Sequence, residues 1–444
     1  MAADVTSGTD TGTDAGTDAG PDDAAGPTAA ERALATVPGR VSGGALIFWL
    51  VLVAVGVVGF WTSVADDPGR AWSTTWANFL FWTALAQAGV VFGAVLQAAK
   101  GHWGKPFRRL AEGTGAFLPV SFLVLVALLV WGAPHVFPWV DGAADARGHV
   151  NLAWLTLDGV LWRNLLMMAV LYLLSFWWLR TVLRVDTPEL AGRVSGWRRG
   201  LVEWIRGGWE GTAEEVERLR TKSGWMAPVL ILAWVAVFTM VSFDLSMSLI
   251  PGFLSVVWGP LFFVGGWLSM LALVAVLAWA HGNRYELDHA WGKWSYHDLG
   301  KLLFAFTIFW AYLWWSQYLV IWYGNLGRET VFFEQRTGGG FGPYWIQMVL
   351  LFGIPFALLL WRKPKMKPAW LAFVAMFTLA GFWLQRHLLV EPSTLEAGFR
   401  LGWPELSVSL GFLGLFGLCY SLFASTFPAV PIRELLVGEA STGP

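Results

Sequence analysis

Hydrophobic residues form long, almost uninterrupted stretches from residue 44 onward. Each stretch is about twenty residues long, the length that an α-helix needs to cross roughly 30 Å of hydrocarbon. Backbone polar groups in lipid must be hydrogen bonded within their own segment, so the stretches predict helices rather than open strands. The sequence therefore predicts an all-α integral membrane protein with about ten spans. The predicted spans are 44–65, 75–99, 112–133, 155–182, 226–250, 255–280, 297–322, 343–361, 368–388 and 405–426.

The segment before the first span has a different character. Residues 1–43 are rich in Ala, Gly, Thr and Asp, and the triplet Gly-Thr-Asp recurs at 8–10, 12–14 and 16–18. Such a segment cannot bury enough apolar surface to fold, and it lacks the basic start and apolar run of a secretory signal. We therefore expect a disordered, acidic, cytoplasmic tail at 1–43, a membrane domain at 44–430 and a short cytoplasmic tail at 431–444.

The positive charges are distributed unevenly between alternate connections. Most Lys and Arg residues lie in the connections around 100–109, 180–222 and 362–367, whereas the alternate connections carry few. Cytoplasmic loops carry the excess of positive charge, so both termini are predicted to be cytoplasmic. In the connector 183–224, Trp and basic residues are interleaved, which indicates either helices lying on an anionic lipid surface or a solvated amphipathic segment.

Composition excludes several classes of protein. Apolar residues make up 56% of the chain and charged residues only 14%, against about 25% in soluble proteins. The net charge of −1 gives no basic excess for nucleic acid. The single cysteine, Cys419, excludes a disulfide framework and a cysteine-ligated cluster held by this chain alone. The seven histidines are expected in connections or at helix ends, which argues against a membrane-embedded haem b, and no metal site is predicted.

Ionisable residues inside spans are costly and are usually functional or paired within the bundle. Asp244 lies near the end of the fifth span and shares a helix face with Ser248, four residues later. Asp244 is either a proton acceptor or a hydrogen-bonding partner for a neighbouring helix, and the sequence does not decide between these roles.

The seventh span carries two groups of polar residues. At its cytoplasmic end, His297, Asp298 and Lys301 can line one side of the helix, as part of a polar half-channel or as a charged helix start that reaches toward water. Toward its outer end, Tyr312 and Gln317 belong to an aromatic stretch. Such a stretch suits a planar amphipathic ligand, but it is also typical of an interfacial aromatic belt.

The remaining polar candidates lie toward the outer side of the predicted topology. Asp158 and Arg163 are five residues apart, about 140° around a helix, so they are not expected to pair with each other. The order of the helices does not determine which candidates meet. The candidate outer polar cavity comprises Ser248, Asp158, Arg163, Tyr312, Gln317, Arg386 and Glu405.

Three stretches together resemble a known family. They are Ser242 to Leu249 followed by Pro251, the run His297 to Leu303, and the tryptophan-rich run Phe309 to Asn325. These residues resemble the ActF-like membrane subunit of bacterial alternative complex III, which belongs to the NrfD/PsrC-like family. The resemblance is densest over 240–330, and the span layout extends it over about 44–430.

The resemblance implies a fold and a role. The fold is a pair of four-helix bundles with flanking helices, in the bacterial inner membrane among lipids. The complex oxidises menaquinol or a related quinol and passes electrons through iron–sulfur and c-type haem subunits to cytochrome c or a terminal oxidase. A homologous membrane subunit binds quinol beside this one. Asp244, Asp298 and Lys301 match positions associated with proton movement or the quinol-side cavity.

Three hypotheses follow. In the first, the chain binds quinol or conducts protons, with Asp244 as acceptor and His297, Asp298 and Lys301 in a half-channel. In the second, it is a non-catalytic scaffold for the outer redox subunits, which is favoured by Ile250 standing where family members commonly have an acid. In the third it is a secondary transporter, a class that more often shows an internal repeat and broken helices.

Overall fold

The computed structural model describes residues 31, 34–140, 154–190, 192–250, 252–285, 288–337, 342–395 and 399–432. Every regular element in these ranges is a helix. Most of the two predicted tails, 1–43 and 431–444, lies outside the described residues.

The described residues contain nine helical segments that are long and apolar enough to cross a membrane. A shorter apolar segment, Pro343–Leu359, supplies the tenth element at the position of the predicted eighth span. The prediction of an all-α integral membrane protein with about ten spanning helices is therefore confirmed. The long segments are α2 (Gly43–Asp66), α3 (Pro68–Ala98), the run from His102 to Val136, α7 (Leu157–Leu183), α10 (Ala213–Leu245), α11 (Trp258–Tyr285), α12 (Asp288–Gly324), α17 (Pro368–Thr394) and α18 (Trp403–Ala424).

Shorter helices complete these segments and connect them. The run from His102 to Val136 contains α4 (Lys105–Glu112), α5 (Leu118–Ala127) and α6 (Ala133–Val136), and the tenth element contains α14 (Pro343–Met348) and α15 (Ile354–Leu359). The connectors contain α8 (Thr187–Leu190), α9 (Trp197–Arg206), α13 (Gly327–Thr337) and α16 (Arg362–Lys365).

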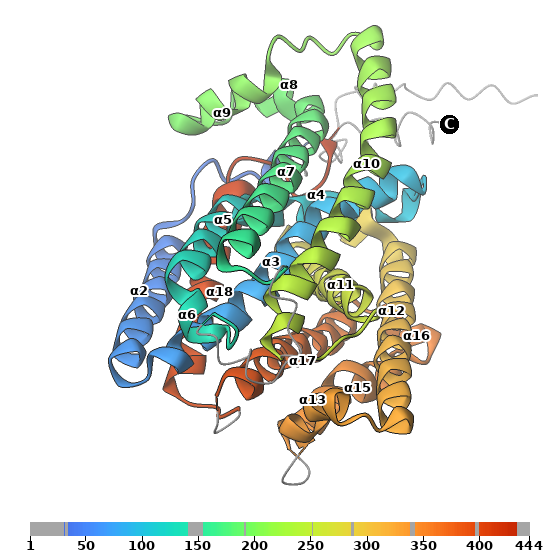
Figure 1. Ribbon diagram of the computed structural model, residues 1–444. Coiled ribbons are helices and arrows are strands. Elements are labelled where there is room, and N and C mark those ends of the chain that lie inside the picture. Colours follow the sequence, from blue (N-terminus) through green and yellow to red (C-terminus); the bar gives the residue numbers. More distant parts are fainter. Residues whose placement is uncertain are drawn as a thin grey trace, which may run out of the picture.

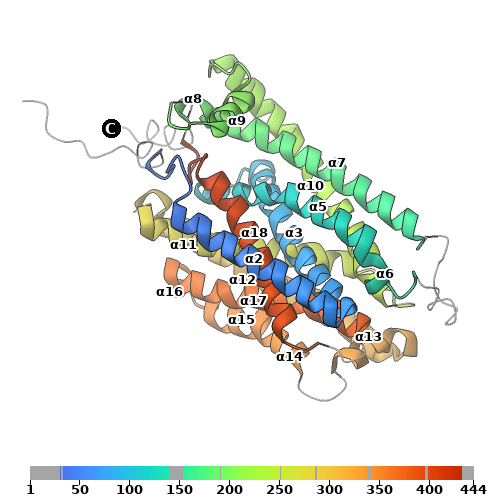
Figure 2. The same cartoon turned by 90° about the vertical axis from the view of Figure 1, so that its left-hand side faces the viewer.

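Successive long helices run in alternating directions between two faces of the molecule (Figures 1 and 2). At one face, Arg198 of α9 donates hydrogen bonds to the Gly39 carbonyl and to Ser425, which joins the connector to the start of α2 and the end of α18. We call this the tail face. The α2–α3 turn and the start of α18 meet at the opposite face, which we call the distal face.

Helix α3 is the centre of the molecule, and 94% of its most apolar window is buried. It contacts α10, α11, α17 and α18 along its length. Small residues allow the close approach: a Cβ at Gly89 would lie 2.5 Å from the Ala111 carbonyl oxygen, and one at Gly266 would lie 3.0 Å from that of Ala84. Small residues at such crossings are typical of helix packing in membranes, where backbones approach closely.

The long helices form two groups, which meet where α3 of the first group packs against α11 and α17 of the second. The first group is α3, the α4–α6 segment, α7 and α10, and the second is α11, α12, the α14–α15 segment and α17. Helices α2 and α18 pack on each other at the flank of the first group (Figure 2). This arrangement agrees with the paired four-helix bundles and flanking helices that the resemblance implies.

The predicted end of the ninth span is wrong by six residues. The helix α17 continues to Thr394 through an internal proline, Pro392. A proline has no N–H to donate to the carbonyl four residues earlier. The carbonyl of Leu388 instead accepts a hydrogen bond from Arg336 Nε of α13 at 2.8 Å. The expectation that every histidine lies in a connection or at a helix end is therefore also wrong, because His387 lies inside α17 and is fully buried.

The predicted connector 183–224 is shorter than expected. Helix α10 begins at Ala213, where Thr212 and Glu215 form a capping box. Capping boxes satisfy two of the free N–H groups at a helix start. The first turns of α10 therefore belong to the tail face, where Figure 1 shows α10 projecting past the other long helices.

The α2–α18 contact gives a direct test of the fold. A Cβ at Gly411 of α18 would lie 2.6 Å from the Cα of Gly56 in α2, and backbone atoms cannot move aside. We expect Gly411→Val to destabilise the protein by about 1–3 kcal/mol, the usual cost of overpacking. Thermal unfolding in detergent measures the change. Gly44→Ala is the control, because a Cβ there meets nothing within 4 Å; equal melting temperatures for the two variants would contradict the packing.

Candidate functional site

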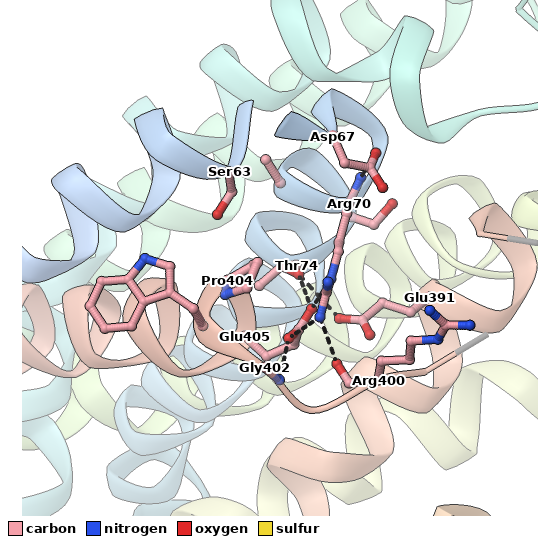
Figure 3. A network of polar contacts seen from close by, with 12 residues as sticks. Ser63, Asp67, Arg70, Thr74, Glu391, Arg400, Gly402, Pro404 and Glu405 are labelled. Atoms are coloured by element: carbon pink, nitrogen blue, oxygen red, sulfur yellow. Dashed lines mark hydrogen bonds and ion pairs between the residues drawn. The ribbon is translucent and has the colours of Figure 1, made fainter. Parts of the chain in front are cut away.

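An ionic network joins α3 and α18 at the distal face (Figure 3). Arg70 in the first turn of α3 makes two hydrogen bonds to Glu405 in the first turn of α18, with Nε–Oε1 and Nη2–Oε2 distances of 2.8 Å. Glu405 is fully buried, and its Oε2 also accepts the Gly402 N–H at 2.8 Å. A two-point guanidinium–carboxylate pair is a strong, oriented interaction. It fixes the start of α18 against the start of α3.

A second carboxylate and a histidine extend this network into the bundle. The hydroxyl of Thr74 lies between two carboxylates, 3.2 Å from Glu391 Oε1 and 3.4 Å from Glu405 Oε1. His387 Nδ1 lies 2.6 Å from Glu391 Oε1, and both side chains are fully buried. Glu391 Oε2 has no hydrogen-bond partner among the described residues. We call Arg70, Thr74, His387, Glu391 and Glu405 the distal network.

The His387–Glu391 pair can hold a proton in two ways. With the proton on His387 the pair is an imidazolium and a carboxylate, and with the proton on Glu391 both groups are neutral. The pair has no net charge in either state, so moving the proton across the 2.6 Å contact adds no uncompensated charge to the interior. Arg70 keeps about a quarter of its side chain exposed, so the network reaches from the bundle interior to the surface of the distal face.

The predicted proton acceptor Asp244 lies in a different kind of site. Its Oδ2 accepts hydrogen bonds from Arg163 Nε and Asn164 Nδ2, both at 2.8 Å, and its Oδ1 accepts from Arg163 Nη2 at 2.8 Å and Trp154 Nε1 at 3.2 Å. The Arg163 guanidinium also lies over the Trp154 ring, 4.0 Å from its centre. Ser248 donates to the backbone carbonyl of Asp244 rather than to the carboxylate. All four carboxylate positions are occupied, so the arrangement ties α7 to α10 and leaves Asp244 no position at which to accept a proton.

A small cavity of about 40 Å³ lies between α11, α12, α13, α14 and α17. Two of the predicted outer residues, Gln317 and Arg386, line it, together with Trp314, Tyr344 and Arg336. Trp314 Nε1 donates to the Tyr344 hydroxyl at 2.9 Å, and the Trp314 ring stacks on Tyr318. We call this space the aromatic cavity. The predicted aromatic stretch thus faces two ways. Trp314 and Gln317 line the cavity, whereas Tyr312 is 62% exposed on the surface of the bundle and does not line it.

The tail-face group stays together as the spacing predicts. Lys301 Nζ lies 2.6 Å from Asp298 Oδ1, and His297 Nδ1 lies 3.7 Å from the same oxygen. Lys365 of α16 is buried nearby, and its pKa is lowered by that burial and by the charge of Lys301. A cavity of about 820 Å³ at the tail face is lined by residues of α3, α4, α7 and α10, not by this group.

The structure therefore does not bring the predicted outer residues together in one cavity. Arg163 pairs with Asp244, Glu405 belongs to the distal network, and Gln317 and Arg386 line the aromatic cavity. Asp158 is exposed at the start of α7 and does not pair with Arg163.

Sequence reasoning missed Arg70, His387 and Glu391. Arg70 falls between the predicted spans 44–65 and 75–99, although α3 begins at Pro68, and the predicted ninth span ends at residue 388, before Glu391. The available signal was the spacing of four between His387 and Glu391, which places both on one helix face.

No protein-family model and no curated protein matches the chain.

The Asp244 site makes a prediction about stability. Asp244→Asn should destabilise the protein by about 3 kcal/mol, because the mutation leaves the Arg163 guanidinium without its counter-charge. The double variant Arg163→Met/Asp244→Leu should recover most of this loss, since no unpaired charge remains. Thermal unfolding of the single and double variants measures how much stability each loses relative to the wild-type protein. A double variant that is less stable than Asp244→Asn would show that the pair does more than compensate charge.

Proposed function

We propose that this chain is a membrane subunit of a respiratory quinol:cytochrome c, or quinol:oxidase, oxidoreductase of the alternative complex III type. It carries no redox centre of its own and works beside a homologous quinol-binding membrane subunit, an iron–sulfur subunit and c-type haem subunits. The paired four-helix arrangement supports the proposal, and so do the resembling stretches, which form the end of α10 and most of α12. We assign the distal face to the outer side of the bacterial inner membrane.

The proposed contribution of this chain is proton transfer rather than quinol binding. Pockets for small molecules typically measure roughly 300–1,000 Å³. The aromatic cavity, at about 40 Å³, is much smaller. The cavity of about 820 Å³ is large enough, but it lies at the tail face, opposite the distal network. The quinol ring is therefore assigned to the sister subunit, with menaquinol or a related quinol as its substrate.

The observation that carries this proposal is the buried His387–Glu391 pair and its connection through Thr74 and Glu405 to Arg70. Quinol oxidation releases protons as well as electrons, and a positioned His or Glu can accept and pass a proton. Asp244, with every acceptor position filled, is a weaker candidate for this role than Glu391, whose Oε2 is free among the described residues. In this proposal Glu391 and His387, rather than Asp244, accept the proton. His297, Asp298 and Lys301 remain candidates for a polar half-channel through which protons enter or leave at the tail face.

A scaffold function is the second candidate, and the outer side of α12 favours it. In the tryptophan-rich run, Tyr312, Trp322 and Tyr323 are 62%, 62% and 84% exposed. Large aromatic side chains at an exposed site are typical of protein interfaces, and also of membrane interfaces. As a scaffold, the chain would hold the outer redox subunits through this side of α12 and would take no part in proton transfer.

Neutralising Glu391 distinguishes the two functions. In the complex purified through a tag on this chain, Glu391→Gln should lower quinol-oxidising turnover at least tenfold, because the amide cannot accept a proton from His387. The haem content of the same preparation, read from the visible spectrum, should stay unchanged. The matched control is Glu334→Gln, an exposed glutamate on α13 that should leave turnover unchanged. Full turnover in Glu391→Gln with normal haem content would contradict proton transfer and leave the scaffold function.

A further inference from the structure

Arg386 is a buried cation whose donors are largely unsatisfied. It lies in α17 and is only 3% exposed. A guanidinium has five N–H donors. The only hydrogen bond that Arg386 makes to the described residues is from Nη2 to the Phe262 carbonyl at 3.1 Å, and its Nε has no partner there. The charge also lies over the Phe262 ring, 4.1 Å from the ring centre.

A second buried cation, Arg336, lines the same cavity. Arg336 is 6% exposed, and its Nε and Nη2 donate to the carbonyls of Leu388 and Leu389. Its Nη1 also donates to the Phe332 carbonyl and its Nη2 to the Ser393 hydroxyl, so every nitrogen has a partner, but none of these partners supplies negative charge. No Asp or Glu is among the residues that line the aromatic cavity. The cavity is therefore bordered by two guanidinium groups that have no carboxylate partner among the described residues.

Glutamine amides around the cavity are unsatisfied as well. Gln317 and Gln347 are 6% and 2% exposed, and their side-chain oxygens, like that of Gln385, have no hydrogen-bond partner among the described residues. The oxygen and nitrogen of an amide exchange places by a simple flip, so each of these side chains can present donors to the cavity. Buried polar groups are normally hydrogen bonded, and several unsatisfied ones around a single cavity indicate a common partner inside it.

The energetics favour a negatively charged partner. Burying an unpaired cation costs several kcal/mol, and a cation–π contact offsets about 2 kcal/mol of that when desolvated. Water in the cavity would satisfy the donors without compensating the charge of two guanidinium groups. The volume of about 40 Å³ holds roughly three waters, or one small anion.

We propose that the aromatic cavity is a binding site for one small monovalent anion, a halide or a small carboxylate. Arg386 and the glutamine amides hold the anion directly, and Arg336 of α13 contributes positive charge to the same cavity. The anion supplies one negative charge between the two buried cations and so holds α13, α14 and α17 together. This inference rests on the cavity alone and does not depend on the proposed respiratory function.

The test uses the full-length protein in mild detergent, exchanged into gluconate, which is too large for the cavity. Replacing gluconate by chloride at constant ionic strength should raise the melting temperature saturably, by about 2–4 °C, because the anion binds the folded state only. A parallel titration with formate distinguishes a halide site from a carboxylate site. The anion that raises the melting temperature at the lower half-saturating concentration is the preferred ligand. A melting temperature that responds to neither anion would overturn the proposal and indicate that water fills the cavity.

Two variants locate the effect. Arg386→Met should abolish the anion-dependent shift and should fold in gluconate, because it removes a buried charge and keeps an apolar stem. Lys363→Met, which removes an exposed charge on α16 at the tail face, should keep the full shift. An anion-dependent shift that persists in Arg386→Met would place the anion elsewhere and contradict the proposal.

Binding itself can be measured without any variant. Equilibrium dialysis of the wild-type protein against radioactive chloride should give saturable uptake, close to one ion per chain, that formate displaces. The absence of saturable uptake would overturn the proposal even if Arg386→Met fails to fold.

Discussion

A charge inside a membrane-spanning bundle has to be compensated by a partner, and this requirement determines how the helices of this protein meet. Asp244 of α10 is compensated by Arg163 of α7, and Glu405 of α18 by Arg70 of α3. Both pairs lie toward the distal face, where they fix the ends of helices. Away from these ends, small residues such as Gly89 and Gly266 allow the helices to pack closely. Arg386 and Arg336 border one cavity and have no carboxylate partner among the described residues, which is the basis of the anion site proposed there.

The distal network differs from the Arg163–Asp244 pair in what it can do. The Asp244 carboxylate is fully occupied by donors, so it behaves as a structural link. In the network, His387 and Glu391 share one short contact, and one oxygen of Glu391 remains free among the described residues. In the proposed function, rigid pairing and proton transfer thus fall to different carboxylates, although both lie at the same face of the bundle.

The sequence was sufficient to predict the class of fold and much of the topology, because the length of an apolar stretch is fixed by the thickness of the membrane. It was also sufficient to predict that His297, Asp298 and Lys301 lie together, since neighbours three and four apart share a helix face. It could not predict that Asp244 meets Arg163, because the side chains lie 81 positions apart and their contact depends on how two helices pack. It missed Glu391 because the predicted ninth span ends at residue 388, whereas α17 continues through Pro392 to Thr394 and Arg336 takes the carbonyl that this proline leaves free.

The most direct test of the central claim is purification in mild detergent through a tag on this chain, followed by a visible absorption spectrum of the product. The chain has a single cysteine and so no Cys-x-x-Cys-His motif with which to bind haem c covalently. The account predicts that c-type haem absorption accompanies the chain, because partner subunits that carry haem come with it. A colourless product that contains this chain alone, in every mild detergent used, would contradict membership of a quinol-oxidising complex.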